Sequence, residues 1–99
     1  MEAISIEIFR QEGEESRVVN LSIQADGSLR LQASDMGPTV KRIWNDDDYE
    51  FWVDVPPEAL RKLLAALLRE KYLGRSDAVD EFRTFCEKET IEHKWQSWT

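Results

Sequence analysis

Eight consecutive residues in the middle of the chain combine acidic and aromatic side chains. The stretch Asn45-Asp46-Asp47-Asp48-Tyr49-Glu50-Phe51-Trp52 places four carboxylates beside three aromatic rings. A calcium loop needs alternating oxygen ligands and a glycine at its sharp bend. This stretch has consecutive aspartates and no glycine, so we expect no metal and interpret it as a partner-binding surface. The expected contact residues are Asp46, Asp47, Asp48, Tyr49, Glu50 and Trp52.

The position of Trp52 has two interpretations. In a strand of period 2, Trp52 falls on the face opposite Phe51 and Val53. If those residues face the core, Trp52 either lies under residues 38–44 or the C-terminal strand, or forms an exposed anchor. We expect the covered position, although aromatic side chains also concentrate at the centres of protein interfaces.

Nucleophilic catalysis has two candidate residues, Cys86 and His93, which are the only cysteine and the only histidine. A catalytic dyad needs both side chains in one cleft with an orienting carboxylate. No motif frames the pair, and the four glycines are too scattered for a phosphate-binding loop. We therefore expect the pair not to meet in such a cleft, and we expect no catalytic residue, no cofactor and no enzymatic activity.

Charge restricts the class of partner. The 99 residues carry a formal net charge of -7, which disfavours nucleic acid and anionic membranes and favours a basic protein. Residues 57–75 are the exception, with two acids against five bases. The alternative nucleic-acid-binding residues are Lys62, Arg69 and Lys71 in this segment. No signal peptide or membrane-spanning run is visible, so we expect a cytoplasmic, bacterial-type protein.

Strands should position the acidic stretch. Isoleucines 4, 6 and 8 alternate with polar residues, and the same period recurs in residues 19–23 and 29–33. Asp26-Gly27 between the last two runs is typical of a tight hairpin turn. The sequence therefore predicts a meander of three antiparallel strands over residues 3–33, with a fourth strand over residues 50–55.

Helices are predicted in the second half of the chain. Leucines recur at helical spacing between Leu60 and Leu68, and Gly74 is placed to end this helix. A shorter helix should follow Ser76 or Asp77, and Pro38 can start a short helical turn carrying Val40, Ile43 and Trp44 to the core. Residues 91–98 have the alternation of a final strand, with Trp98 either held in a groove or exposed as a contact.

These elements predict a single α+β domain over residues 1–99. Its expected order is strand-strand-strand-strand-helix-helix-strand (β-β-β-β-α-α-β), with both helices packed on one face of the antiparallel sheet. The leucine stripe is wider than one sheet face requires, because Leu63-Leu64 and Leu67-Leu68 are adjacent pairs. We therefore expect a homodimer that uses one edge of the stripe.

Three short patterns resemble a group of small, acidic bacterial proteins without an assigned activity. They are Asp35-x-Gly37-x-x-Val40, Trp44-x-Asp46-Asp47-x-Tyr49-Glu50 and Val55-Pro56-x-Glu58-x-Leu60, within about residues 29–68. The order of four strands before a helix also resembles the whirly-type single-stranded nucleic-acid binders. Those proteins use a basic, aromatic strand face, whereas residues 1–56 here carry twelve acids and five bases.

The sequence favours a non-enzymatic interaction module. In its most specific form, this is an inhibitory or immunity-type protein that presents its acidic surface to a basic partner such as a nuclease. The alternative is a whirly-like binder of single-stranded nucleic acid. An enzyme that uses Cys86 and His93 is the third interpretation.

Overall fold

The computed structural model describes residues 2–46 and 48–98. Asp47, part of the expected acidic surface, lies outside the described residues. The chain divides into two compact units, residues 1–62 and residues 63–99, and each unit is described by itself. The single domain expected over residues 1–99 stays a prediction.

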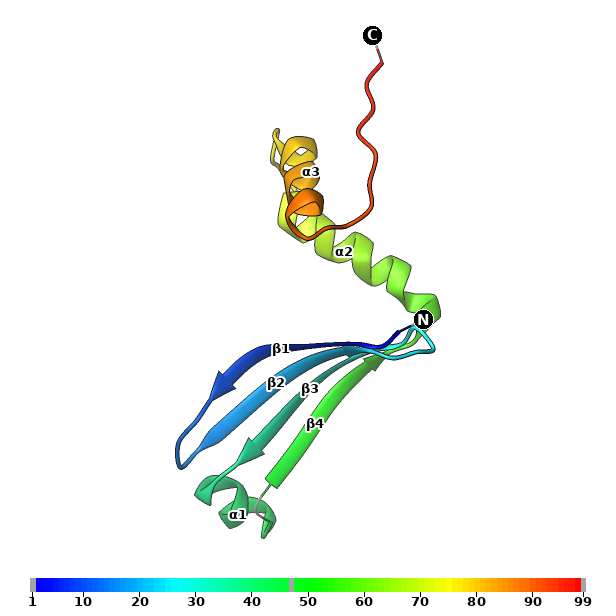
Figure 1. Ribbon diagram of the computed structural model, residues 1–99. Helices are drawn as coiled ribbons and strands as arrows, with labels where there is room; N and C mark the ends of the chain where they lie inside the picture. Colours follow the sequence, from blue (N-terminus) through cyan, green and yellow to red (C-terminus); the bar gives the residue numbers. More distant parts are fainter. Residues whose placement is uncertain (1, 47, 99) are drawn as a thin grey trace. The chain divides into compact units, whose positions relative to one another are not determined.

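The first unit contains a four-stranded antiparallel sheet with the strand order β1-β2-β3-β4 (Figure 1). Its strands are β1 (Ile4–Gln11), β2 (Ser16–Ile23), β3 (Leu29–Met36) and β4 (Asp48–Val55). Each strand pairs antiparallel with the next along the chain, which confirms the predicted meander and the α+β class. The fourth strand begins at Asp48, so part of the acidic stretch belongs to the sheet itself.

The hairpin turn between β2 and β3 forms where Asp26-Gly27 predicted it. The amide of Gln24 donates to the carbonyl of Ser28 at 2.8 Å, which leaves a three-residue loop. Gly27 has a φ of 90°, in the region that favours glycine. The Asp26 carboxylate accepts bonds from the Ser28 amide at 2.8 Å and the Ser28 hydroxyl at 2.7 Å, which fixes the loop.

A β-bulge in β1 changes the predicted alternation. Glu7 lies opposite Asn20 and Phe9 lies opposite Val19, so Ile8 is an extra residue without a cross-strand partner. Phe9 therefore shares a face with Ile4 and Ile6. The expectation that Ile8 continues the alternation of Ile4 and Ile6 is wrong. The bulge depends on pairing with β2, which strand periodicity alone does not contain.

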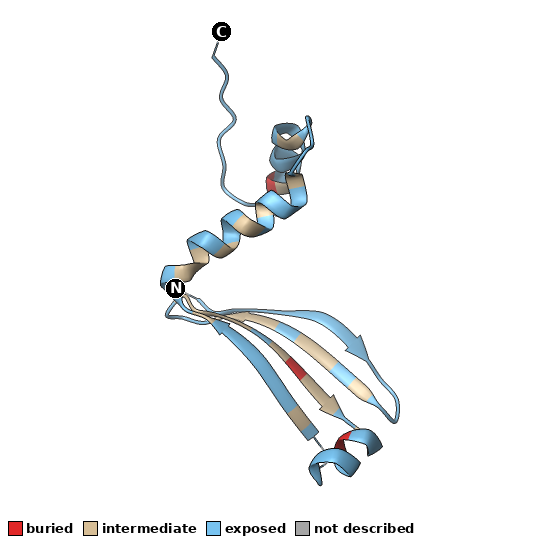
Figure 2. Cartoon of the chain, turned by 180° about the vertical axis from the view of Figure 1, so that it is seen from behind, coloured by how far each residue is buried: buried red, intermediate tan, exposed pale blue. Residues whose placement is uncertain are grey.

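The sheet has one apolar and one polar face. The apolar face consists of Ile4, Ile6, Phe9, Val19, Leu21, Ile23, Leu29, Leu31, Ala33, Phe51, Val53 and Val55, closed at one end by Arg17, Asp35 and Tyr49. The polar face includes Ser5, Glu7, Arg10, Asn20, Ser22, Arg30, Gln32, Ser34, Asp48, Glu50, Trp52 and Asp54. Among the described residues of this unit, Ala33 and Val40 alone are buried (Figure 2). The strands thus expose apolar surface that a folded chain usually buries.

Helix α1 (Pro38–Trp44) connects β3 to β4. Pro38 stands in its first turn, as predicted. Glu15, from the β1–β2 loop, caps this helix: its carboxylate accepts bonds from the Thr39 amide at 2.9 Å and the Thr39 hydroxyl at 2.6 Å. Val40 is buried, whereas Ile43 and Trp44 remain exposed, so only one of the three expected side chains reaches the core.

The second half of the chain is helical. A 3-10 turn (η1, Pro57–Ala59) leads into α2 (Leu60–Tyr72), and α3 (Ala78–Lys88) follows. In the second unit the Tyr72 and Phe82 rings meet edge to face, with centroids 6.1 Å apart. Cys86 on α3 is buried. No helix in the described ranges has both the length and the apolar character needed to cross a bilayer.

A Schellman-type turn ends α3. Thr90 has a φ of 57°, its amide donates to Glu87, and the Ile91 amide donates to the Cys86 carbonyl at 2.9 Å. Residues 91–98 follow in an extended conformation without a strand assignment, so they do not form the expected final strand. Residues 93–95 line a cavity with α3 instead, and the Arg83 guanidinium lies 5.1 Å from the Trp95 ring centroid. Trp98 is almost fully exposed, which excludes the expected groove.

The observed order is therefore strand-strand-strand-helix-strand-helix-helix, with the 3-10 turn before α2. It differs from the expected order by the addition of α1 and by the missing strand at residues 91–98. The packing of two helices on one face of the sheet stays a prediction.

Replacing Gly37 by alanine should destabilise the first unit strongly. Gly37 has a φ of 138°, and an added Cβ would collide with the Glu14 carbonyl oxygen. Gly13 is a matched control, because its φ is 137° and the nearest atom to an added Cβ lies 3.9 Å away. Gly13→Ala should lose about 1–3 kcal/mol of unfolding free energy from backbone strain, and Gly37→Ala clearly more. Urea denaturation followed by circular dichroism measures both, and equal losses would contradict the collision.

Candidate partner-binding surface

The described acidic residues stand at the surface, within the edge strand β4 or just before it. Asp46, Asp48 and Glu50 are all exposed. Asp48 and Glu50 lie on the polar face, opposite Met36 and Ser34 of β3, which carry no positive charge. Among the ion pairs formed by described residues, none includes Asp48 or Glu50. Their charges are therefore compensated by solvent rather than by a neighbouring base.

Trp52 shares the polar face with these carboxylates and is held by an arginine. Trp52 is 48% exposed, so the expected covered position is wrong and the indole stands at the surface. The Arg30 guanidinium lies 4.8 Å from its ring centroid. Arg30 in turn forms a bidentate pair with Asp54, at 2.7 and 3.1 Å. The indole is thus held in place by contacts within the sheet.

Arg30 and Asp54 were not predicted as site residues. The bonds from Arg30, and a further one from Trp52, hold the pKa of the Asp54 carboxyl below its ordinary value. Asp54 follows Trp52 by two residues, so strand alternation alone places both on one face. Arg30 could not be added from the sequence, because its position depends on the β3–β4 register.

Tyr49 belongs to the opposite face. Its ring lies 4.8 Å from the Trp44 ring and 5.5 Å from the Phe51 ring, measured between centroids. Tyr49 is half-buried there. The predicted contact residues are therefore divided: Asp48, Glu50 and Trp52 share one face, and Tyr49 contributes to the packing of the other.

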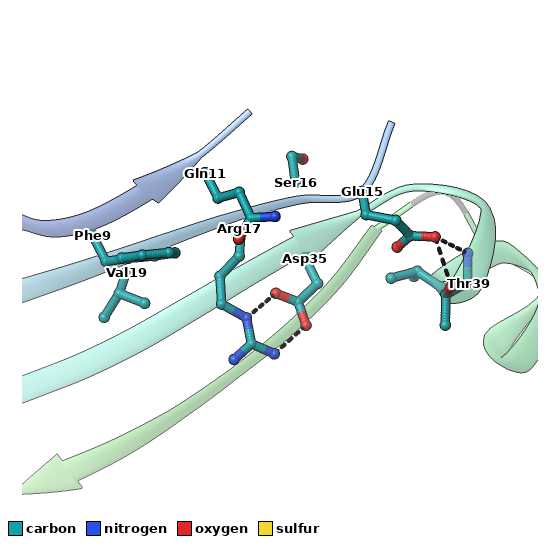
Figure 3. Close-up of a pocket in the computed structure, with 9 residues that line it drawn as sticks. Phe9, Gln11, Glu15, Ser16, Arg17, Val19, Asp35 and Thr39 are labelled. Carbon is teal, nitrogen blue, oxygen red and sulfur yellow. Dashed lines mark hydrogen bonds and ion pairs between the residues drawn. The ribbon is translucent and has the colours of Figure 1, made fainter. Parts of the chain in front are cut away.

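The apolar face carries a second arginine–aspartate pair, in an open hollow of about 550 Å3 (Figure 3). Arg17 donates two bonds to Asp35, at 2.6 and 2.7 Å, and its guanidinium lies 5.4 Å from the Phe51 centroid. These bonds lower the pKa of Asp35. The two bonds from Thr39 likewise lower the pKa of Glu15, whose carboxylate lines the same hollow. The polar groups of the hollow are thus largely bonded to one another and serve to fix the fold.

The basic residues proposed for nucleic-acid binding do not form one cluster. Lys62 and Arg69 are seven residues apart in α2 and share a helical face, whereas Lys71 points about 180° away from Lys62. The Lys71 ammonium lies 4.1 Å from the Phe85 ring centroid, against α3. It is therefore engaged inside the second unit.

Cys86 and His93 line the same small cavity, of about 90 Å3, in the second unit. Its other lining residues are Val79, Phe82, Arg83, Lys94 and Trp95, so among described residues no carboxylate lines it. His93 Nδ1 lies 2.7 Å from the Ile91 carbonyl oxygen, which accepts a bond from the ring. We did not expect the two side chains to share a cavity. Its walls offer cations and apolar groups rather than an acid to orient the imidazole.

Metal ligands do not gather in the part of the chain that the structure describes: no group of three or more His, Cys, Asp or Glu side chains could hold an ion there. Comparisons with family models, curated proteins and solved structures found no match.

Acid should weaken the fold through the bonded carboxylates. The pKa values of Glu15, Asp35 and Asp54 are lowered on folding. Their stabilisation is complete above the unfolded carboxyl pKa, about 4, and is lost as the pH falls through the lower folded values. Below that pH, the free energy of unfolding should fall less steeply in the double variant Arg17→Met, Arg30→Met than in the control Arg69→Met. The control removes an arginine that does not bind Asp35 or Asp54. Urea denaturation at several pH values measures the slopes, and parallel curves would contradict this origin.

Proposed function

We propose that the protein is a non-enzymatic interaction module whose acidic surface on β4 binds a basic protein. It would act as an inhibitory or immunity-type protein does, by covering the partner's cationic surface. The contact residues of this proposal are Asp46, Asp47, Asp48, Glu50 and Trp52. The observation that carries it is the exposed indole of Trp52, fixed by Arg30 on the same face as the solvated Asp48 and Glu50 carboxylates.

Each part of this surface suits binding. The carboxylates stand in water, so the free protein does not bear the free-energy cost of burying unpaired charges. They also attract a cationic partner toward the surface. An indole fixed in place loses little conformational freedom on binding, and tryptophan is enriched among the residues that dominate interface energies. Arg30 and Asp54 are therefore positioning residues for Trp52.

A nuclease is a reasonable class of partner. Arginine and lysine side chains that bind phosphate also form charge-assisted bonds with carboxylates. Nucleic acid itself is a poorer candidate, because the net charge is -7 and phosphate binding depends on displaced counterions around cations. Lys71, one of the three candidate basic residues, already lies against Phe85.

Neutralising the acidic surface should slow association with a basic partner. The test variant is Asp46→Asn, Asp47→Asn, Asp48→Asn, Glu50→Gln. The control variant, Glu2→Gln, Glu70→Gln, Glu89→Gln, Glu92→Gln, changes net charge equally at other positions. Surface plasmon resonance against a panel of basic nucleases should show a slower association rate, by about 10-fold or more at low salt, for the test variant alone. A panel member that binds both variants equally well would contradict the proposed surface.

Two further measurements complete this test. Trp52→Ala should act mainly on the dissociation rate, because it removes a contact rather than long-range attraction. Titration of the native protein with single-stranded DNA should give no saturable, salt-dependent binding. Saturable binding that Lys62→Gln and Arg69→Gln abolish would favour the nucleic-acid alternative instead.

We also propose a homodimer in which the helices cover one face of the sheet. The apolar face carries half-exposed side chains such as Ile6, Leu31 and Phe51. On α2, Leu64 and Leu67 are 59% and 54% exposed, whereas Leu63 and Leu68 are half-buried, so one edge of the leucine stripe is left open. Burial of these side chains against a second copy would remove the exposed apolar area from water.

Light scattering should return twice the chain mass of 11.6 kDa at micromolar concentration. The double variant Leu64→Glu, Leu67→Glu should return the mass of one chain, because charged side chains disfavour burial. Leu73→Glu is the control, since Leu73 is 78% exposed and lies beyond the end of α2. A native mass near that of one chain would reject the homodimer.

A further inference from the structure

The outer edge of β4 is open for pairing with another strand. In the four-stranded sheet β4 has β3 as its only neighbour among described strands. All eight residues of β4 are in continuous register with β3, from Asp48 opposite Met36 to Val55 opposite Leu29. Alternate backbone N–H and C=O groups of such a strand point away from the sheet and can pair with an added strand.

The other edge of the sheet differs in this respect. The bulge at Ile8 interrupts the register of β1, and the Arg10 side chain forms ion pairs with Glu7 and Glu12 nearby. A bulge that interrupts the register is one device by which edge strands avoid pairing. Residues 48–55 contain no bulge, no proline and no glycine. A strand that joins this sheet would therefore join at β4.

The side chains of β4 specify what can be added. In the two longest registers of an antiparallel β4–β4 pair of two copies, with both polar faces on one side, Asp48 or Glu50 would lie opposite Asp54 of the second copy. Like charges directly opposite one another destabilise a strand pair, so the edge disfavours its own copy. Lysine or arginine at those positions would face carboxylates instead, while Phe51 and Val53 on the apolar face would meet apolar side chains.

We propose that the free edge of β4 binds an extended segment of the basic partner, in which lysine or arginine alternates with apolar residues. The inference rests on the proposed function and specifies how the partner is held. The segment pairs main chain to main chain with β4, its cations lie beside Asp48 and Glu50, and its apolar side chains extend the apolar face. Main-chain bonds supply affinity, and the alternation supplies specificity.

The test uses a capped peptide of alternating lysine and valine, as long as β4. In one derivative every lysine is N-methylated, and in the other every valine is. Each derivative therefore lacks the N–H donors along one edge of the peptide. Strand addition needs the donors of one edge only. One derivative should therefore bind like the parent and the other at least about 10-fold more weakly. Amides on the outer edge of β4 should gain protection from hydrogen exchange when the parent binds.

A block peptide, with all lysines before all valines, is the composition control and should bind weakly. Equal binding of both methylated peptides, sensitive to Glu50→Lys, would overturn strand addition while the acidic surface remained the binding site. No binding of the parent peptide would overturn strand addition as well. The nuclease assay decides the proposed function independently, because it needs no particular backbone conformation in the partner.

Discussion

Cross-strand pairs of arginine with aspartate fix the register on which the sheet depends. Arg17 of β2 binds Asp35 of β3, and Arg30 of β3 binds Asp54 of β4. A slip of one residue would move every side chain to the other face, and it would also break these bidentate bonds. Each arginine then covers a ring of β4, Phe51 on one face and Trp52 on the other. The edge strand therefore has a defined set of side chains on each face.

The two faces of the sheet differ in how their side chains interact with water. The apolar face exposes large hydrophobic groups, such as Ile4, Leu31 and Val53, whose burial is favourable. The polar face keeps its carboxylates solvated at little cost and uses Trp52 as its rigid aromatic group. One sheet thus presents an exposed apolar surface and, separately, a surface with solvated carboxylates.

Local patterns predicted much of this fold. Period-2 alternation and the Asp26-Gly27 turn are encoded within a few residues, so the strands of the meander and their hairpin were found from sequence. The exposure of Asp46, Asp48 and Glu50 was also expected, because burying unpaired carboxylates is costly. The same alternation would have placed Tyr49 and Trp52 on opposite faces, since they are three residues apart, but the prediction grouped them by composition.

Features that depend on pairing between distant residues were not predictable in this way. The bulge at Ile8 exists only against β2, and the hold of Arg30 on Trp52 exists only in the β3–β4 register. The alternation of residues 91–98 fits a strand, and it fits equally well an extended segment that lies along a helix. The Schellman turn at Thr90 and the contact of Arg83 with Trp95 give the second outcome.

If β4 accepts an added strand as proposed, the bulge in β1 would limit how large an assembly of sheets can become. Open-ended polymers grow when both edges of a sheet accept strands, because each added molecule then offers a fresh edge to the next. Here the interrupted register at Ile8 makes β1 a poor template for pairing. Strands would therefore be added at the β4 edge alone, and the sheet would not grow from both edges. An aromatic-rich sheet with exposed apolar groups can in this way remain a finite particle rather than seed a filament.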